Sequence, residues 1–124
     1  MFNTVTDNDI MRNVLEIPIK VRVTDKDLED ILLLALEVGI SYWCRQYDRT
    51  GKFGITLYHV ESDDKWSFDK RDLLRGIEQY IASEKQWSIL NTDNYGVYVD
   101  TALVDAYVAD TIIQYACMGK VVFS

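Results

Sequence analysis

Hydrophobic and polar positions along the chain repeat with two different periods, which predict both strands and helices. Residues 16–23 alternate with a period of two, which is typical of a strand with one solvent-facing side. The following segment carries its apolar side chains on one helical face and begins with a capping box of Thr24 and Asp27. This pattern predicts a long helix from Asp25 to about Trp43. Apolar residues nearly surround that helix, so it must be covered on several sides, by the sheet and by another helix or subunit.

The rest of the pattern predicts two more helices and several short extended segments. Asp69 can cap a helix over 70–83, and a third helix begins at Asp100 or Thr101 and ends at Gly119, which suits a left-handed cap. The other expected elements are an N-terminal arm at 1–15, a polar turn at 45–52, a strand at 53–61, an acidic loop at 62–65, extended segments at 87–90 and 95–99, and a last short strand at 121–123.

These elements predict one α+β domain spanning residues 1–124, with a small, mainly antiparallel sheet packed against about three helices. The chain has one proline and no Gly/Ser-rich linker, so no domain boundary is expected. A chain of 124 residues buries roughly two-thirds of its unfolded surface, which is enough for a core without a disulfide or metal. Cys44 and Cys117 have no CxxC partner, and free thiols favour a cytoplasmic location.

Charge and hydropathy narrow the function classes. The net charge is −7, so phosphate backbones and anionic membranes repel the protein, and direct nucleic-acid binding is not expected. No apolar run approaches the ~20 residues of a membrane span. The acidity leaves two interpretations open, namely simple solubility or imitation of a nucleic acid.

Catalytic motifs are missing from the sequence. His59 is the single histidine and lies in the middle of a predicted strand, where a packed or surface role is more common than a catalytic one. Cys44 has no neighbouring base in the sequence, and a carboxylate pair such as Glu37 and Asp110 has no histidine to complete a metal site. No catalytic residue, metal ligand or cofactor is therefore predicted.

One candidate binding segment follows the first long helix. Tyr42, Trp43, Arg45 and Arg49 combine aromatic rings with guanidinium groups in an otherwise acidic chain. Such a combination suits a nucleotide, because a base stacks on a ring while arginines pair with phosphate oxygens. The alternative is that the two aromatic residues are core residues at a helix end and the cations are solvated.

A second candidate is the polar set within the apolar third helix. Asp110 and Gln114 lie four residues apart and share a helical face, with Tyr107 and Tyr115 nearby. A buried carboxylate needs hydrogen-bond donors, so this set predicts a buried polar network, a subunit contact or a ligand pocket.

Two stretches of the chain resemble a known family. ALEVGISYWC at 35–44 is similar to ALEGGINYWC, and ADTIIQYACMG at 109–119, with 121–123, is similar to DADAIIQYALFGEIVFG. Both patterns belong to an uncharacterised family of small bacteriophage and prophage proteins of Gram-positive bacteria. Val38 stands where that pattern has its first glycine. The shared positions are Glu37, Tyr42, Trp43, Asp110, Gln114 and Tyr115. The resemblance implies a phage protein of the host cytoplasm, and small phage proteins of this kind often counter host defence.

The expected function is therefore a non-catalytic, homo-oligomeric binding protein that sequesters a nucleotide-like molecule. The predicted ligand-binding residues are Tyr42, Trp43, Arg45, Arg49, Asp110, Gln114 and Tyr115. The alternatives are an anti-CRISPR-like inhibitor of a host defence effector, a small enzyme, and a structural phage component. The inhibitor interpretation requires one acidic surface formed by Asp25, Asp27, Glu29, Asp30, Asp63 and Asp64.

Overall fold

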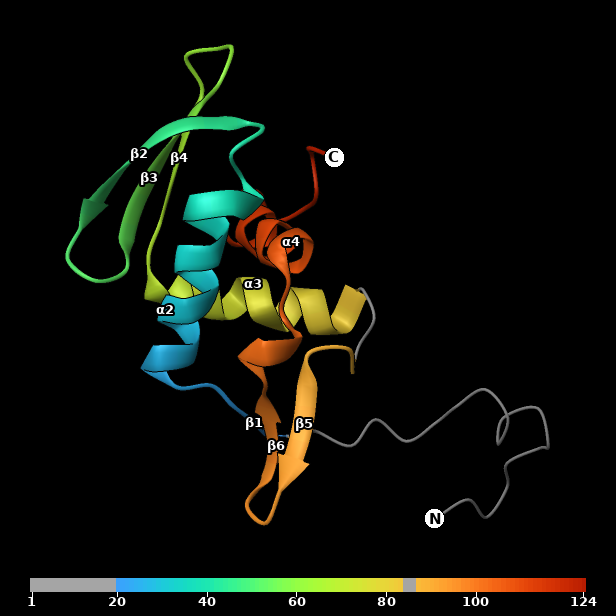
Figure 1. The fold of residues 1–124 in the computed structure, drawn as a ribbon. Coiled ribbons are helices and arrows are strands. Elements are labelled where there is room, and N and C mark those ends of the chain that lie inside the picture. The colour runs from blue at the N-terminus through green and yellow to red at the C-terminus, as the bar shows by residue number, and fades with distance from the viewer. Residues whose placement is uncertain (1–19, 84–86) are drawn as a thin grey trace, which may run out of the picture.

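The computed structural model describes residues 20–83 and 87–124, which form two small sheets around three helices (Figure 1). The elements in chain order are β1 (Val21–Arg22), α2 (Asp25–Leu34), a π-helical turn η1 (Ala35–Gly39), β2 (Cys44–Thr50), β3 (Gly54–His59), β4 (Lys65–Phe68), α3 (Lys70–Ser83), β5 (Leu90–Asp93), β6 (Gly96–Val99), a 3-10 turn η2 (Thr101–Leu103) and α4 (Ala106–Met118). The α+β class with about three helices is confirmed. The predicted arm at 1–15, and the first part of the strand predicted at 16–23, lie outside the described residues.

The two sheets are mostly antiparallel. One has the order β2-β3-β4, with both neighbouring pairs antiparallel. The other has the order β1-β6-β5, in which β1 runs parallel to β6 while β6 and β5 are antiparallel. In the first sheet Leu57 lies between Tyr47 and Trp66, and Ile55 lies opposite Phe68. Since directly opposed residues share a face, this alternation turns the apolar side of the sheet towards the helices.

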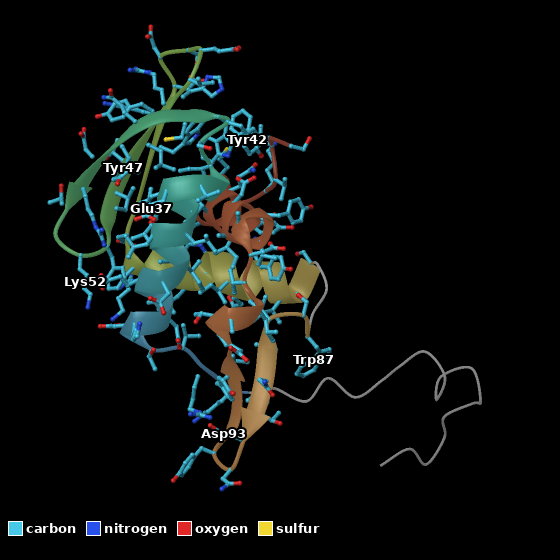
Figure 2. The ribbon with its side chains drawn as sticks, viewed as in Figure 1. Glu37, Tyr42, Tyr47, Lys52, Trp87 and Asp93 are labelled. Atoms are coloured by element: carbon cyan, nitrogen blue, oxygen red, sulfur yellow. The ribbon has the colours of Figure 1, made fainter. Side chains whose placement is uncertain are left out.

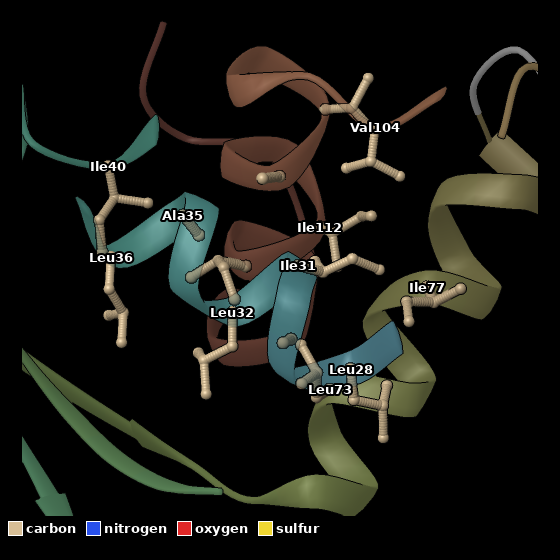
Figure 3. Close-up of a cluster of buried hydrophobic side chains, with 14 of the residues drawn as sticks. Leu28, Ile31, Leu32, Ala35, Leu36, Ile40, Leu73, Ile77, Val104 and Ile112 are labelled. Carbon is tan, nitrogen blue, oxygen red and sulfur yellow. The ribbon is translucent and has the colours of Figure 1, made fainter. Parts of the chain in front are cut away.

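The core lies between α2, α3 and α4 (Figure 3). Thr24 and Asp27 cap α2 reciprocally, as predicted, and the buried side chains of this helix lie on its apolar face. A close crossing of α3 and α4 is possible because residue 76 is glycine, and a Cβ there would lie 2.6 Å from the carbonyl oxygen of Ile112. The side chains that α2, η1 and the residue directly after η1 contribute to this core are Leu28, Ile31, Leu32, Ala35, Leu36 and Ile40.

The predicted long helix ends earlier than expected. It becomes a π-helical turn at Ala35 and ends at Gly39, and residues 40–43 form a turn closed by the bond from the Cys44 amide to the Ile40 carbonyl. A tertiary contact with α4 explains this early end. A Cβ at Gly39 would lie 2.6 Å from the Ala106 carbonyl oxygen, so α4 crosses the chain here. Trp43 is thereby directed into the core, where it is 1% exposed.

The predicted polar turn at 45–52 is wrong, because most of it is the edge strand β2. Every β2 residue except Cys44 is exposed, so burial imposes no alternation on the sequence. The strand β4 was not predicted, and it begins at Lys65 within the expected acidic loop. The expected last strand at 121–123 is also wrong, since those residues have no strand pairing.

The third predicted helix is split at its beginning. The turn η2 precedes α4, and α4 begins only after Asp105, whose side chain accepts a hydrogen bond from the Val108 amide. Gly119 caps α4 at a φ of 74°, as predicted. No helix among residues 20–83 and 87–124 is both long and apolar enough to cross a membrane.

Candidate functional site

The buried carboxylate of Asp110 joins the two segments that the sequence singled out. Asp110 is 5% exposed on the inner face of α4. Its Oδ2 accepts a hydrogen bond of 2.6 Å from the Tyr42 hydroxyl, and its Oδ1 accepts one of 2.8 Å from the indole Nε1 of Trp43. Gln114 Nε2 donates a third bond of 2.9 Å to Oδ1. Four of the predicted ligand-binding residues therefore form one network, which we call the Asp110 network.

Gln114 connects this network to the C-terminal segment of the chain. Its Oε1 accepts bonds from the amides of Val122 at 2.7 Å and Phe123 at 2.8 Å, while its Nε2 also donates to the Phe123 carbonyl at 3.0 Å. The Gln114 side chain is fully buried. It thus replaces the strand partner that residues 121–123 lack, and it holds these residues against α4.

Phe123 fixes the same segment by aromatic packing. Its ring is stacked on Trp43 with centroids 4.9 Å apart and on His59 with centroids 5.2 Å apart. Trp66 meets Phe123 edge-on at 5.9 Å. Offset and edge-on pairs of this kind stabilise by about 0.5–1.5 kcal/mol each beyond their buried area. The packed or surface role predicted for His59 agrees with this position. Sequence reasoning missed Trp66 and Phe123, because no local pattern marks rings that meet only in the folded chain.

The network holds Tyr42 as a hydrogen-bond donor. Burial, followed by the hydrogen bond to Asp110, raises the pKa of the Tyr42 hydroxyl well above its ordinary value. The phenol therefore keeps its proton throughout the physiological range. Close approach of η1 to α4 makes this contact possible, since a Cβ at Gly39 would lie 3.5 Å from the Asp110 Cβ.

A solvent-open pocket of about 340 Å³ lies directly beside the Asp110 network. Tyr42 is 48% exposed, Tyr107 is 72% exposed and Val38 is 54% exposed, so three apolar or aromatic groups are accessible there. Figure 2 places Tyr42 near the C-terminus, at the end of the molecule away from Trp87 and Asp93. The lining residues are Val38, Gly39, Tyr42, Ala106, Tyr107, Asp110 and Ser124. We call this the Tyr42 pocket.

The two predicted arginines lie elsewhere, on β2. Arg45 donates from Nε to the His59 carbonyl at 2.9 Å, and its guanidinium carbon lies 5.6 Å from the centre of the Tyr58 ring. Arg49 donates twice to the Lys52 carbonyl. Among the described residues, neither arginine has a hydrogen bond or ion pair with the Asp110 network. The predicted combination of these arginines with Asp110 in one ligand site is therefore not assembled.

Arg45 instead borders a second pocket of about 460 Å³ between β2 and the end of the α2–η1 segment. Its polar lining includes Ser41, Gln46 and Tyr47. The buried apolar residues of the lining are Leu36, Ile40 and Cys44. We call this the β2 pocket. Tyr115, the remaining predicted residue, is half-buried on α4 and lines neither pocket.

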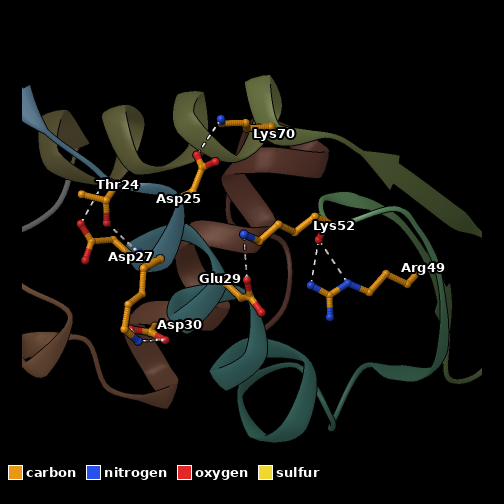
Figure 4. A network of polar contacts seen from close by, with 9 residues as sticks. Thr24, Asp25, Asp27, Glu29, Asp30, Arg49, Lys52 and Lys70 are labelled. Carbon is orange, nitrogen blue, oxygen red and sulfur yellow. Dashed lines mark hydrogen bonds and ion pairs between the residues drawn. The ribbon is translucent and has the colours of Figure 1, made fainter.

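The acidic residues at the beginning of α2 are largely neutralised by cations (Figure 4). Asp25 pairs with Lys70 at 2.6 Å, and Glu29 pairs with Lys52 at 3.4 Å. Asp30 pairs with Lys26, and Asp27 caps its own helix. The loop that contains residues 63 and 64 joins β3 to β4, at the end of the sheet opposite to Lys52. The acidic residues of the inhibitor hypothesis thus do not form one continuous unpaired surface.

Groups with possible catalytic chemistry occupy structural positions. His59 is stacked in the aromatic cluster, and its Nδ1 lies 2.9 Å from the Ser62 hydroxyl. Burial raises the pKa of the Cys44 thiol, which makes it a poor nucleophile. Among the described residues, no three His, Cys, Asp or Glu side chains are grouped as a metal site would require.

The fold and site define a small α+β protein with a buried polar network that supports an open aromatic pocket. No family model matches the chain, and neither curated proteins nor solved structures provide a match.

Proposed function

We propose that this protein acts by binding a positively charged partner protein through the surface around the Tyr42 pocket, without catalysing a reaction. The observation that carries the proposal is the exposure of Tyr42, Tyr107 and Val38 directly beside a buried carboxylate. Tyrosine is enriched where proteins bind each other, and exposed apolar groups gathered at one place mark interaction sites. A net charge of −7 further favours association with a basic partner.

The biological setting of this proposal comes from the resemblance to phage and prophage proteins. We infer a counter-defence role in the cytoplasm of a bacterial host, in which the partner is a defence effector. The pairing of the acidic residues on α2 favours recognition by a defined pocket over imitation of a nucleic acid. The partner is thus expected to insert a side chain rather than to lie on a uniformly acidic face.

A second candidate function is sequestration of a nucleotide-like molecule in the β2 pocket. The specific observation in its favour is that Arg45 and Tyr47 border this pocket together, so a guanidinium and a ring are available to a phosphate and a base. Tyr47 is 42% exposed, and a base can therefore reach its ring. This candidate requires neither Asp110 nor Gln114.

Phage plating on host strains that each carry one defence system tests both functions. We expect the protein to restore plating on at least one strain, and we expect Tyr107→Ser to abolish this effect. Tyr95→Ser is the matched control, because Tyr95 is 85% exposed in the turn between β5 and β6. Loss of the effect in Arg45→Gln, with Tyr107→Ser still active, would instead favour nucleotide sequestration. Failure to restore plating on every strain would contradict the counter-defence role.

For the strain on which plating is restored, the purified effector provides the binding test. Binding should weaken as salt rises from 50 to 500 mM, since the Debye length falls from roughly 14 to 4 Å over about this range. A complex with the same stability throughout, or one unaffected by Tyr107→Ser, would contradict docking of a basic partner at this surface.

A further inference from the structure

The charge of Asp110 has no positive partner among the described residues. Its three donors are a phenol, an indole and a primary amide, and all three are neutral. The ion pairs of the described residues are formed elsewhere, as with Lys70 and Asp25 or Arg22 and Asp93. A carboxylate removed from water and held only by neutral donors attracts any cation that can reach it.

The carboxylate of Asp110 also has an acceptor position that no hydrogen bond from the described residues uses. Two carboxylate oxygens offer about four acceptor positions. Among residues 20–83 and 87–124, Oδ1 accepts from both Trp43 and Gln114, whereas Oδ2 accepts only from Tyr42. One acceptor position on Oδ2 therefore remains for a further donor, and Asp110 belongs to the lining of the Tyr42 pocket.

The walls of the pocket suit the stem of a cationic group. Val38 offers an apolar surface, and Tyr42 and Tyr107 offer rings that attract cations. A volume of about 340 Å³ lies at the lower end of the range of ligand pockets, which suits one side chain better than a large ligand. A phosphate or carboxylate would be repelled by Asp110, so an anionic ligand does not fit here.

We propose that the Tyr42 pocket binds one alkylammonium or alkylguanidinium group, whose N–H bonds to Asp110 Oδ2 while its alkyl stem packs against Val38 and the tyrosine rings. In the complex, this group is a lysine or arginine side chain of the partner protein, an identification that rests on the proposed function. Because Oδ1 is already occupied, a guanidinium can bind only through one end. An arginine therefore cannot bind Asp110 in the bidentate geometry that normally favours it over lysine, and an ammonium binds at least as tightly.

The test uses the tryptophans as internal reporters in ¹H–¹⁵N spectra of the full chain. The chain has three tryptophans, and the Trp43 indole N–H is bonded to Asp110 itself. The probes are n-butylammonium and methylguanidinium chloride, with n-butanol and sodium chloride as neutral and ionic controls. We expect the Trp43 indole signal to shift saturably with both cations at millimolar concentration, while Trp87, which is exposed at the other end of the molecule, stays unchanged.

Variants assign the binding to this pocket. Asp110→Asn should weaken binding of n-butylammonium by about tenfold or more, which corresponds to the loss of one charge-assisted bond. Should this variant fold poorly, Val38→Lys gives an independent test. Val38 is exposed, and a lysine there places its own ammonium at the pocket and should block the probe. Tyr95→Ala is the control, and it should leave binding unchanged.

Three results would overturn the proposal. They are a Trp43 shift with n-butanol as large as with n-butylammonium, no saturable shift up to roughly 100 mM cation, and unchanged binding in a folded Val38→Lys variant. Putrescine tests the assignment to a protein side chain. If it binds more than about tenfold tighter than acetyl-Gly-Lys-Gly-amide, that assignment is wrong.

The failure of this inference and that of the proposed function can be distinguished. If the pocket binds cations but the Tyr107→Ser variant still restores plating, the binding site is supported and the docking function is contradicted. Loss of plating with Tyr107→Ser, without any cation binding, would uphold the docking surface and overturn the assigned ligand.

Discussion

Substitution of Gln114 tests whether this side chain holds the C-terminal segment in place. Gln114→Met keeps the length and much of the volume of the side chain but removes every hydrogen bond. Three bonds to the C-terminal segment are lost, at about 1 kcal/mol each, together with one bond to the Asp110 carboxylate, at about 1.5–3 kcal/mol. A long contact of 3.5 Å from Nε2 to the Tyr42 hydroxyl is lost as well and adds little. When the C-terminal segment leaves α4, its amides can bond to water, which limits the total loss in the free energy of unfolding. We expect a loss of about 4 kcal/mol in the free energy of unfolding.

Urea denaturation, followed by circular dichroism and tryptophan fluorescence, measures this loss. Thermal denaturation should show a decrease of about 15 °C in Tm, from roughly 4 °C per kcal/mol for a chain of this size. Gln79→Met is the matched control, because Gln79 is a half-buried glutamine on α3 outside the network. Its effect should stay within about 0.5 kcal/mol.

A double-mutant cycle separates anchoring of the segment from general loss of packing. Phe123→Ala removes the ring between Trp43 and His59. If Gln114 and Phe123 hold the same segment, the double variant should lose at least about 1 kcal/mol less than the sum of the single losses. Additivity within about 0.5 kcal/mol, or a loss below about 1 kcal/mol for Gln114→Met alone, would refute the anchoring argument.

Four further predictions follow from other parts of the structure. Gly39→Ala should lower the free energy of unfolding by about 1–3 kcal/mol in urea, because its Cβ would meet the Ala106 carbonyl oxygen at 2.6 Å. The hydrogen bond from the backbone amide of Asp72 lowers the pKa of the Asp69 carboxyl group. The stability that the ionised Asp69 contributes is therefore complete above about pH 4 and is lost as the pH falls through the lowered pKa. Urea midpoints measured from pH 5 to pH 2.5 should fall less steeply in Asp69→Asn than in the unmodified protein. Burial raises the pKa of the Cys117 thiol to about 12, and a thiol-reactive dye at pH 8 should label it far more slowly in the native protein than in urea. A native mass spectrum tests the predicted homo-oligomer, and a monomer alone would contradict it.

Local signals in the sequence predicted most helix ends correctly. The capping box at Thr24, the helix cap at Asp69 and the left-handed Gly119 depend only on neighbouring residues, and all three are found as expected. The end of the first helix could not be predicted, because the approach of α4 to Gly39 determines it. The strand β2 was missed for a related reason, since an exposed edge strand has no buried face to impose a pattern.

The candidate site was only partly predictable. Tyr42, Trp43, Asp110 and Gln114 each attracted attention, yet nothing in the sequence indicates that residues 42 and 43 bond to a carboxylate 68 and 67 positions later. The structure also gives a different explanation for the apolar surface of the first helix. The apolar surface of the first helix suggested association of subunits, but its side chains pack largely against α3 and α4 of the same chain. Burial of this helix therefore does not require a second subunit, and the homo-oligomer stays a prediction.

Asp110 raises a question that hydrogen bonding alone does not answer, namely why this position carries a charge. An asparagine has the same shape, and its Oδ1 can accept the bonds from Trp43 and Gln114 while its amide donates to the Tyr42 oxygen. A neutral residue would also avoid part of the free-energy penalty for burying a charge. We therefore expect Asp110→Asn to change the free energy of unfolding by less than about 1.5 kcal/mol, although it should weaken cation binding by about tenfold or more. A loss of more than about 3 kcal/mol in urea, with cation binding retained in the folded fraction, would instead make the charge a purely structural feature.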